Sequence, residues 1–214
     1  MSNVKDMIAK RAAEEIKPNS IVNLGIGIPT LVADYLNDDH FDLHTENGLL
    51  GVSAVREDDI DPLRVNAGKL PVGEAVGAAY FHSADSFAMI RGGHVDAAIL
   101  GALQVDSKGR VANWAIPGKD IIGVGGAMDL LVGAKKIIIT TRHVSKDGSP
   151  KLVGECTYPI TSTRIADTII TDLAVFQWNG EKYVLTELMG DASLEEVVNN
   201  TTLDFEVGVN VGEG

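Results

Sequence analysis

The sequence predicts an α/β fold: an open, mostly parallel sheet with helices on both faces and an antiparallel hairpin near the C-terminus. Three observations lead to this prediction. Two short apolar runs, residues 97–100 and 137–139, are typical of strands buried on both faces. A strand, a glycine turn and a helix are expected in succession over residues 21–36, as at the start of a βαβ unit. Asn179-Gly180, between two apolar segments, predicts a tight hairpin.

The N-terminal part of the chain alternates predicted helices and strands. Ile8, Ala12 and Ile16 recur every four residues among charged residues, which indicates an amphipathic helix. Pro29 suits the first turn of a helix. The predicted elements are a helix within residues 1–17, a strand at 21–24, a helix at 30–36 and a strand at 41–45.

The rest of the chain follows the same pattern. Ser83 is expected to cap a helix that ends at Gly92-Gly93, and Ser193 with Glu196 forms a capping box for a last helix. The predicted elements are a helix at 83–91, strands at 97–100, 111–115 and 136–141, hairpin strands at 173–178 and 182–188, and a helix from 193 to about 200. Because no repeat, linker or low-complexity tract interrupts the chain, we expect residues 1–214 to form one domain.

Composition and charge exclude several classes of protein. A hydrophobic content of 45% argues against wholesale disorder. Lys and Arg number 18 against 30 Asp and Glu, and the net charge of −12 disfavours partners such as nucleic acid or an anionic membrane. A single cysteine excludes an intrachain disulfide. The charged N-terminus and the lack of a long apolar run predict a soluble, cytoplasmic protein.

Three glycine-rich segments are candidates for binding an anion or an oxyanion through backbone amides. Gly25 and Gly27 lie between a predicted strand and a predicted helix, but Thr30 stands where a dinucleotide fingerprint needs a third glycine. Residues 100–104 follow the predicted strand at 97–100, and residues 123–128 precede a short predicted helix. For all three segments, a tight turn or close packing explains the glycines equally well.

Few residues offer other chemistry. No histidine pairs with another histidine or with cysteine at metal-ligand spacing, so no metal site is expected. Cys156 is interpreted as a buried apolar residue rather than a nucleophile. Glu46 stands at the end of a predicted strand, where open α/β sheets bind their ligands. By position alone, however, a solvated turn residue is the favoured interpretation of Glu46.

Nine strings, taken together, are more specific. They are VNLGIGIPT (22–30), TENGLLG (45–51), VNAGK (65–69), FAMIRGGHVD (87–96), LGALQV (100–105), ANW (112–114), IPGK (116–119), GGAMDL (125–130) and IITDLAVF (169–176). In this order they resemble the β subunits of the family I CoA-transferases, which include 3-oxoacid and acetate or butyrate–acetoacetate CoA-transferases. The resemblance runs the length of the chain.

The resemblance implies a site and a set of partners. Glu46 corresponds to the nucleophile, and Gly101 and Ala102 correspond to the segment that lies against the thioester carbonyl. The residues implied to contact CoA are Gly25, Gly27, Asn47, Gly101, Ala102 and Gln104. The family further implies an α subunit, a heterotetramer of two α and two β chains, and coenzyme A as a substrate, with no permanently bound cofactor.

The implied reaction moves CoA from an acyl-CoA to a free 3-oxoacid or short-chain acid through a glutamyl-CoA thioester. Carboxylate and thiolate are both ionised forms, so the reaction requires no general base. Residues 52–59 depart from the family pattern, which leaves the acid specificity open. Three alternatives also stay open: an acyl-CoA hydrolase using the same glutamate, a sugar-phosphate isomerase, and a scaffold for a partner chain.

Overall fold

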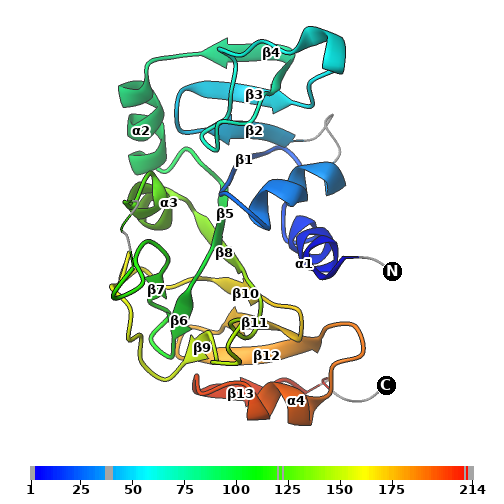
Figure 1. Cartoon of the computed structure of the whole chain (residues 1–214), viewed down its shortest axis with the longest axis vertical. Coiled ribbons are helices and arrows are strands. Elements are labelled where there is room, and N and C mark those ends of the chain that lie inside the picture. Colours follow the sequence, from blue (N-terminus) through cyan, green and yellow to red (C-terminus); the bar gives the residue numbers. More distant parts are fainter. Residues whose placement is uncertain (1–2, 37–40, 120, 122, 210, 212–214) are drawn as a thin grey trace.

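The structure, a computed structural model, describes residues 3–36, 41–119, 121, 123–209 and 211 (Figure 1). Among these residues, ten strands form one sheet along the long axis of the molecule. In sheet order they are β13 (Phe205–Val207), β12 (Tyr183–Leu188), β11 (Ala174–Trp178), β10 (Thr168–Ile170), β8 (Lys136–Thr140), β5 (Ala97–Gly101), β1 (Ser20–Leu24), β2 (Phe41–Thr45), β3 (Leu49–Ser53) and β4 (Gly73–Tyr80).

The middle of this sheet is parallel. β10, β8, β5, β1 and β2 are neighbours in that order, and each adjacent pair is parallel. Antiparallel pairs flank them, with β3 and β4 beyond β2 and with β11 and β12 beyond β10. Asn179-Gly180 connects β11 to β12, and the φ of +105° at Gly180 suits a hairpin turn. The predicted mostly parallel sheet and its C-terminal antiparallel hairpin are confirmed.

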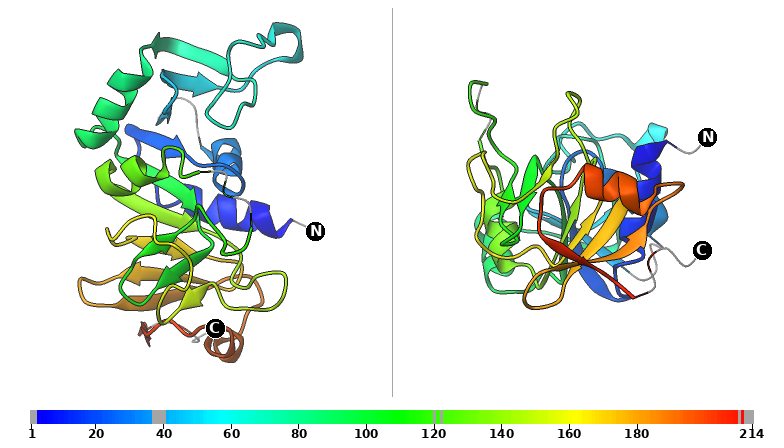
Figure 2. Two further views of the ribbon diagram at one scale, coloured as in Figure 1. Left: turned by 60° about the vertical axis from the view of Figure 1, so that its left-hand side comes forward. Right: turned by 90° about the horizontal axis from the view of Figure 1, so that it is seen from below.

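Helices cover both faces of the sheet, as predicted (Figure 2). The helices of the described residues are α1 (Val4–Ala13), the 3₁₀ helix η1 (Pro29–Tyr35), the short, exposed 3₁₀ helix η3 (Glu57–Asp59), α2 (Ser83–Arg91), α3 (Ala127–Gly133) and α4 (Leu194–Asn199). Ile99 of β5 belongs to an apolar cluster with residues of α1 and η1, whereas Leu100 belongs to the opposite cluster, with residues of α2 and α3. Within the described part of the chain, no helix has both the length and the apolar character that a membrane span requires.

A small second sheet covers part of the face that carries α2 and α3. It consists of β7 (Val111–Ala112), β6 (Gln104–Asp106) and β9 (Leu152–Val153). Val105, Val111 and Leu152 are fully buried in the same apolar cluster as Leu100. The last helix is capped as expected, because the Glu196 N–H donates to the Ser193 hydroxyl at 3.1 Å.

The helix predicted at 30–36 is present as the 3₁₀ helix η1: no side chain caps its start at Ile28, and i→i+3 hydrogen bonds close its turns. One local prediction was wrong. The second helix is capped by His82 rather than Ser83, because His82 keeps an extended backbone and its Nδ1 accepts from the Ala84 N–H at 3.1 Å. Ser83 is the first helical residue.

The parallel strands bring three sequence segments to one edge of the sheet. β1 lies between β2 and β5 and runs parallel to both. Gly25 follows β1, Glu46 follows β2, and Gly101 is the last residue of β5. Because the carboxyl ends of parallel strands meet at one edge, these residues become neighbours although up to 76 positions separate them in the sequence.

A buried histidine makes the stability of the fold depend on pH. His143 is fully buried between Thr171 and Thr201, with each ring nitrogen within 2.9 Å of a hydroxyl oxygen. Burial lowers its pKa from 6.5 to about 4, although Asp172 opposes the shift. Between these two values the unfolded chain binds a proton that the folded chain does not.

We therefore expect the free energy of unfolding to fall as the pH drops from about 6.5 towards about 4. Urea denaturation at several pH values measures this dependence. His143→Gln, which does not titrate, is expected to be less stable at pH 7.5 but to lose less stability on acidification. An equally steep fall in the variant would contradict the assignment.

Candidate active site

Glu46 lies in the tight turn that connects β2 to β3. The turn is closed by the Gly48 N–H, which donates to the Thr45 carbonyl at 3.0 Å. Gly48 has a φ of +118°, and a Cβ there would come within 2.1 Å of the Phe81 carbonyl oxygen. The positive φ and the short distance to Phe81 both require glycine at position 48, two residues after Glu46.

The side chains next to Glu46 attach a second loop to this turn. Thr45 Oγ1 donates to Asn47 Oδ1 at 2.6 Å and accepts from the Ala67 N–H at 2.9 Å. Asn47 Nδ2 donates to the Val65 carbonyl at 2.8 Å. Asn47 is exposed, and its side chain thus holds the loop of residues 65–67 beside Glu46.

Glu46 lines a cavity of about 460 Å³ at the carboxyl ends of β1, β2 and β5. Gly25, Gly101 and Ala102 line the same cavity, so four of the predicted site residues come together. The segment 123–127, which leads into α3, also lines this cavity. A cavity with one carboxylate and several backbone amides is suited to a substrate carbonyl that gains negative charge.

The Glu46 carboxylate has two close neighbours. Its Oε2 accepts from Nδ2 of Asn23, a β1 residue that is only 1% exposed, at 3.4 Å. On the other side, a Cβ at Gly126 would come within 3.1 Å of Glu46 Cγ and 3.2 Å of Oε1. The half-buried carboxylate is therefore held between an amide on β1 and a glycine at the start of α3.

The backbone opposite Glu46 is held by side chains behind it. Asn113 Nδ2 donates to the Gly101 carbonyl at 3.2 Å, and Thr141 Oγ1 donates to the Ala102 carbonyl at 2.9 Å. Lys151 Nζ donates in turn to Thr141 Oγ1 at 3.0 Å, and burial lowers the pKa of this lysine. Because each peptide is planar, fixing its carbonyl also fixes the direction of its N–H.

The other predicted residues lie elsewhere. Gly27, which has a φ of +98°, does not line the Glu46 cavity, and neither does Asn47. The Gln104 side chain accepts from the N–H groups of Thr157 and Tyr158 at 2.9 and 3.1 Å, which ties β6 to that loop. Burial, with a smaller contribution from Asp106, raises the pKa of the Cys156 thiol to about 12, consistent with an unreactive cysteine.

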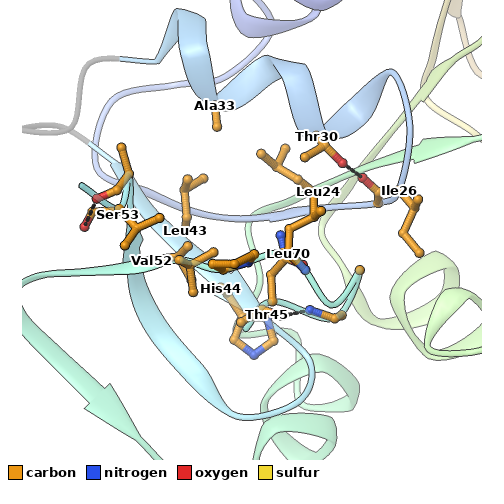
Figure 3. A pocket seen from close by; sticks show the side chains of 18 of the residues that line it. Leu24, Ile26, Thr30, Ala33, Leu43, His44, Thr45, Val52, Ser53 and Leu70 are labelled. Atoms are coloured by element: carbon orange, nitrogen blue, oxygen red, sulfur yellow. Dashed lines mark hydrogen bonds between the residues drawn. The ribbon is translucent and has the colours of Figure 1, made fainter. Parts of the chain in front are cut away.

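A second cavity of about 420 Å³ lies between η1, β2, β3 and residues 66–72 (Figure 3). Its walls are largely apolar, and Leu24, Leu43 and Val52 contribute to them. It shares Leu24, Gly25, Ile26 and Ala67 with the Glu46 cavity. The two cavities therefore flank the end of β1. Within the part of the chain that the structure describes, no three His, Cys, Asp or Glu side chains are grouped as metal ligands.

A model of a protein family, described as coenzyme A transferase, matches residues 5–200. The chain belongs to the coenzyme A transferase family. It is 47% identical over 213 residues to one subunit of the probable succinyl-CoA:3-ketoacid coenzyme A transferase of Bacillus subtilis, covering 99% of both chains. It is also 47% identical over 210 residues to the beta chain of the acetate CoA-transferase of Escherichia coli, covering 98% of this chain and 96% of that one. This coenzyme A transferase is therefore of the β type, as the sequence motifs indicated.

Solved structures share the fold of this coenzyme A transferase. The acyl-CoA transferase YdiF of Escherichia coli O157:H7 superposes with a TM-score of 0.80 at 23% identity, over 98% of this chain and 42% of that one. Glutaconate coenzyme A-transferase of Acidaminococcus fermentans gives a TM-score of 0.70 at 18% identity, over 96% of this chain and 86% of that one. The decarboxylase AibA/AibB gives 0.71 at 21% identity, over 98% and 87%. At these identities the likeness shows the fold alone.

Sequence reasoning missed the contacts of Asn23 and Asn113. One signal was available for Asn23, because it is a polar residue in the otherwise apolar segment 21–24. Its direction towards Glu46 depends on the parallel register of β1 and β2, which pairs Asn23 with His44. For Gly126 the sequence left two interpretations open, and the structure brings this glycine against Glu46.

Gly126→Ala tests the contact with Glu46. The φ of −81° at Gly126 permits alanine, so the effect comes from the new methyl group against the carboxylate. We expect the transfer rate of this coenzyme A transferase to fall by roughly tenfold through misplacement of Glu46, with little loss of stability. Gly154→Ala is the matched control, because its Cβ would meet Thr202 O at 3.3 Å outside both cavities. Equal rates in the two variants would contradict the expectation.

Proposed function

We propose that this chain transfers CoA from an acyl-CoA to a free carboxylic acid, acting together with an α subunit. Glu46 is the nucleophile of the proposal, and a glutamyl-CoA thioester is its intermediate. The observation that carries the proposal is the position of the Glu46 carboxylate in a cavity bounded by the Gly101–Ala102 backbone. Membership of the coenzyme A transferase family supports the same reaction.

The proposed reaction has two halves. One Glu46 oxygen attacks the acyl-CoA carbonyl, the carbon–sulfur bond breaks, and a mixed anhydride and CoA thiolate form. The thiolate then attacks the Glu46 carbonyl and expels the first acid as a carboxylate, leaving glutamyl-CoA. The second acid reverses both steps, so that Glu46 is regenerated and the new acyl-CoA leaves. Every nucleophile is already ionised, and protons are neither taken up nor released.

Three features of the site support this chemistry. The half-buried position of Glu46 removes part of the water that makes a hydrated carboxylate a poor nucleophile. Asn23 holds one carboxylate oxygen and leaves Oε1 as the oxygen for attack. We assign the Ala102 N–H as a donor to the oxyanion, because the carbonyls on both sides of it are fixed by Asn113 and Thr141. One such donor contributes roughly 10²–10³ in rate.

The names of the relatives support a proposal for the substrate class. Those named for succinyl-CoA and 3-ketoacids, for acetate, and for 3-oxoadipate (in Pseudomonas putida) are each 47% identical to this chain. We propose a 3-oxoacid or short-chain acid as the acceptor. Since CoA is anionic and the chain carries a net charge of −12, we assign much of the CoA tail to the α subunit.

The remaining assignments are predictions of the same kind. Gly25 and Ala102 are proposed to contact the reacting end of CoA from within the Glu46 cavity. Contacts of Gly27, Asn47 and Gln104 with CoA stay predictions, and so do one domain over residues 1–214, an α₂β₂ assembly and a cytoplasmic location.

Glu46→Gln tests the nucleophile. An amide cannot form the anhydride, so we expect transfer to fall by on the order of 10⁴-fold or more while the fold is retained. CoA transfer is measured for the assembly with its α subunit, with acetate, succinate and acetoacetate as acceptors, and circular dichroism checks the fold. Glu46→Asp is the matched variant, which keeps the charge but shortens the reach.

The same assay separates transfer from hydrolysis. Transfer predicts that the new acyl-CoA forms only when an acceptor acid is present and that little free CoA accumulates without it. Release of free CoA at a rate independent of the acceptor would identify an acyl-CoA hydrolase. Transfer by Glu46→Gln at a near wild-type rate would contradict the proposal.

A further inference from the structure

His44 is a buried histidine that touches the Glu46 site from behind. It is 3% exposed, and it directly precedes the turn that carries Glu46. Its Nδ1 lies 3.1 Å from Asn23 Nδ2, and its Nε2 lies 2.9 Å from Ser86 Oγ on α2. The ring also stacks on Phe81, with the ring centroids 6.2 Å apart. Figure 3 shows the ring below Thr45, directed away from η1.

The hydrogen-bond pattern determines which ring nitrogen carries the proton. Asn23 Nδ2 has two N–H groups and three neighbouring acceptors, which are Nδ1 and the carbonyl of His44, both at 3.1 Å, and Glu46 Oε2 at 3.4 Å. This end of the amide is therefore the donor, and one N–H is shared between two acceptors. A donor opposite His44 Nδ1 requires a lone pair on that nitrogen. The proton is therefore on Nε2, which donates to Ser86 Oγ. Burial lowers the pKa of His44 to about 4, so the ring is neutral near pH 7.

The oxygen of the Asn23 amide, Oδ1, is buried, and it has no hydrogen-bond partner among the described residues. A flipped amide would place this oxygen against the His44 carbonyl and the Glu46 carboxylate, both of which are acceptors. An unsatisfied buried oxygen is unfavourable and therefore calls for an explanation at this site. The observed orientation leaves Oδ1 unpaired but keeps Nδ2 directed at Glu46.

We infer that His44, oriented by Ser86, is a positioning residue that holds the Asn23 amide with its N–H towards Glu46 Oε2. This inference rests on the proposed function, because it assigns the two Glu46 oxygens. Oε1 forms the bonds to acyl carbon, and Oε2 becomes the carbonyl oxygen of the anhydride. When thiolate attacks that carbonyl, negative charge collects on Oε2, where the Asn23 N–H stabilises it.

The test compares two variants of His44 in the assembly with the α subunit. His44→Gln keeps an acceptor for Asn23 and a donor for Ser86, whereas His44→Met keeps an extended side chain but offers neither. We expect His44→Met to lower kcat for CoA transfer by about tenfold, the effect of one hydrogen bond to a charged group. KM is expected to change by less than about twofold, because His44 does not line the Glu46 cavity. His44→Gln is expected to restore most of kcat.

Two further variants separate positioning from packing. Ser86→Ala removes the acceptor that selects the Nε2–H form, so we expect a several-fold loss of kcat with unchanged KM. Phe81→Leu changes only the packing against the ring, so its kcat is expected to stay near that of wild type. If His44→Met does not assemble, Ser86→Ala and His44→Gln carry the test alone.

The inference fails if His44→Gln loses as much kcat as His44→Met, or if Ser86→Ala keeps the wild-type kcat. It also fails if Phe81→Leu lowers kcat as much as His44→Met does, since packing against the ring would then explain the loss. These outcomes are distinct from failure of the proposed function, which Glu46→Gln detects. A Glu46-dependent enzyme that is indifferent to residues 44 and 86 would overturn this inference alone.

Discussion

The parallel pairing of β1 with both β2 and β5 is the constraint on which the site depends. It sets Asn23 opposite His44 on one side and opposite Ala98 on the other. With that register, the turn after β2 carries Glu46 to the same edge at which β5 ends in Gly101. A slip of one residue would turn Asn23 to the opposite face of the sheet and replace it with an apolar neighbour. The buried amide and the carboxylate are therefore consequences of strand pairing.

The site places one charged group among neutral hydrogen-bonding groups. Asn23, Asn113 and Thr141 orient the carboxylate or the backbone opposite it, and none of them changes charge near neutral pH. Such fixed dipoles suit a reaction whose nucleophiles are already ionised, because they need not rearrange as charge moves between oxygen and sulfur.

The sequence predicted most of the central sheet because its apolar runs, such as residues 137–139, are local signals. It did not predict β3, β4, β6 or β9, and it predicted β7, within residues 111–115, without its partners. Their pairing joins distant segments, and the strands are short or interrupted by glycine, as at Gly51. The sequence predicted Glu46 as the nucleophile from its motif and from its place at a strand end. The contacts of Asn23 and Gly126 with Glu46 depend on the register and on the position of α3, which no local pattern encodes.

Peptide mass spectrometry tests the central claim most directly. The chain assembled with its α subunit is exposed to acetoacetyl-CoA without an acceptor acid, digested and searched for covalent CoA. The account predicts CoA bound through a thioester to the peptide that contains Glu46, and loss of this adduct when succinate or acetate is added. Turnover of CoA with no adduct, or with an adduct on another residue, would contradict the assignment of Glu46 as the nucleophile.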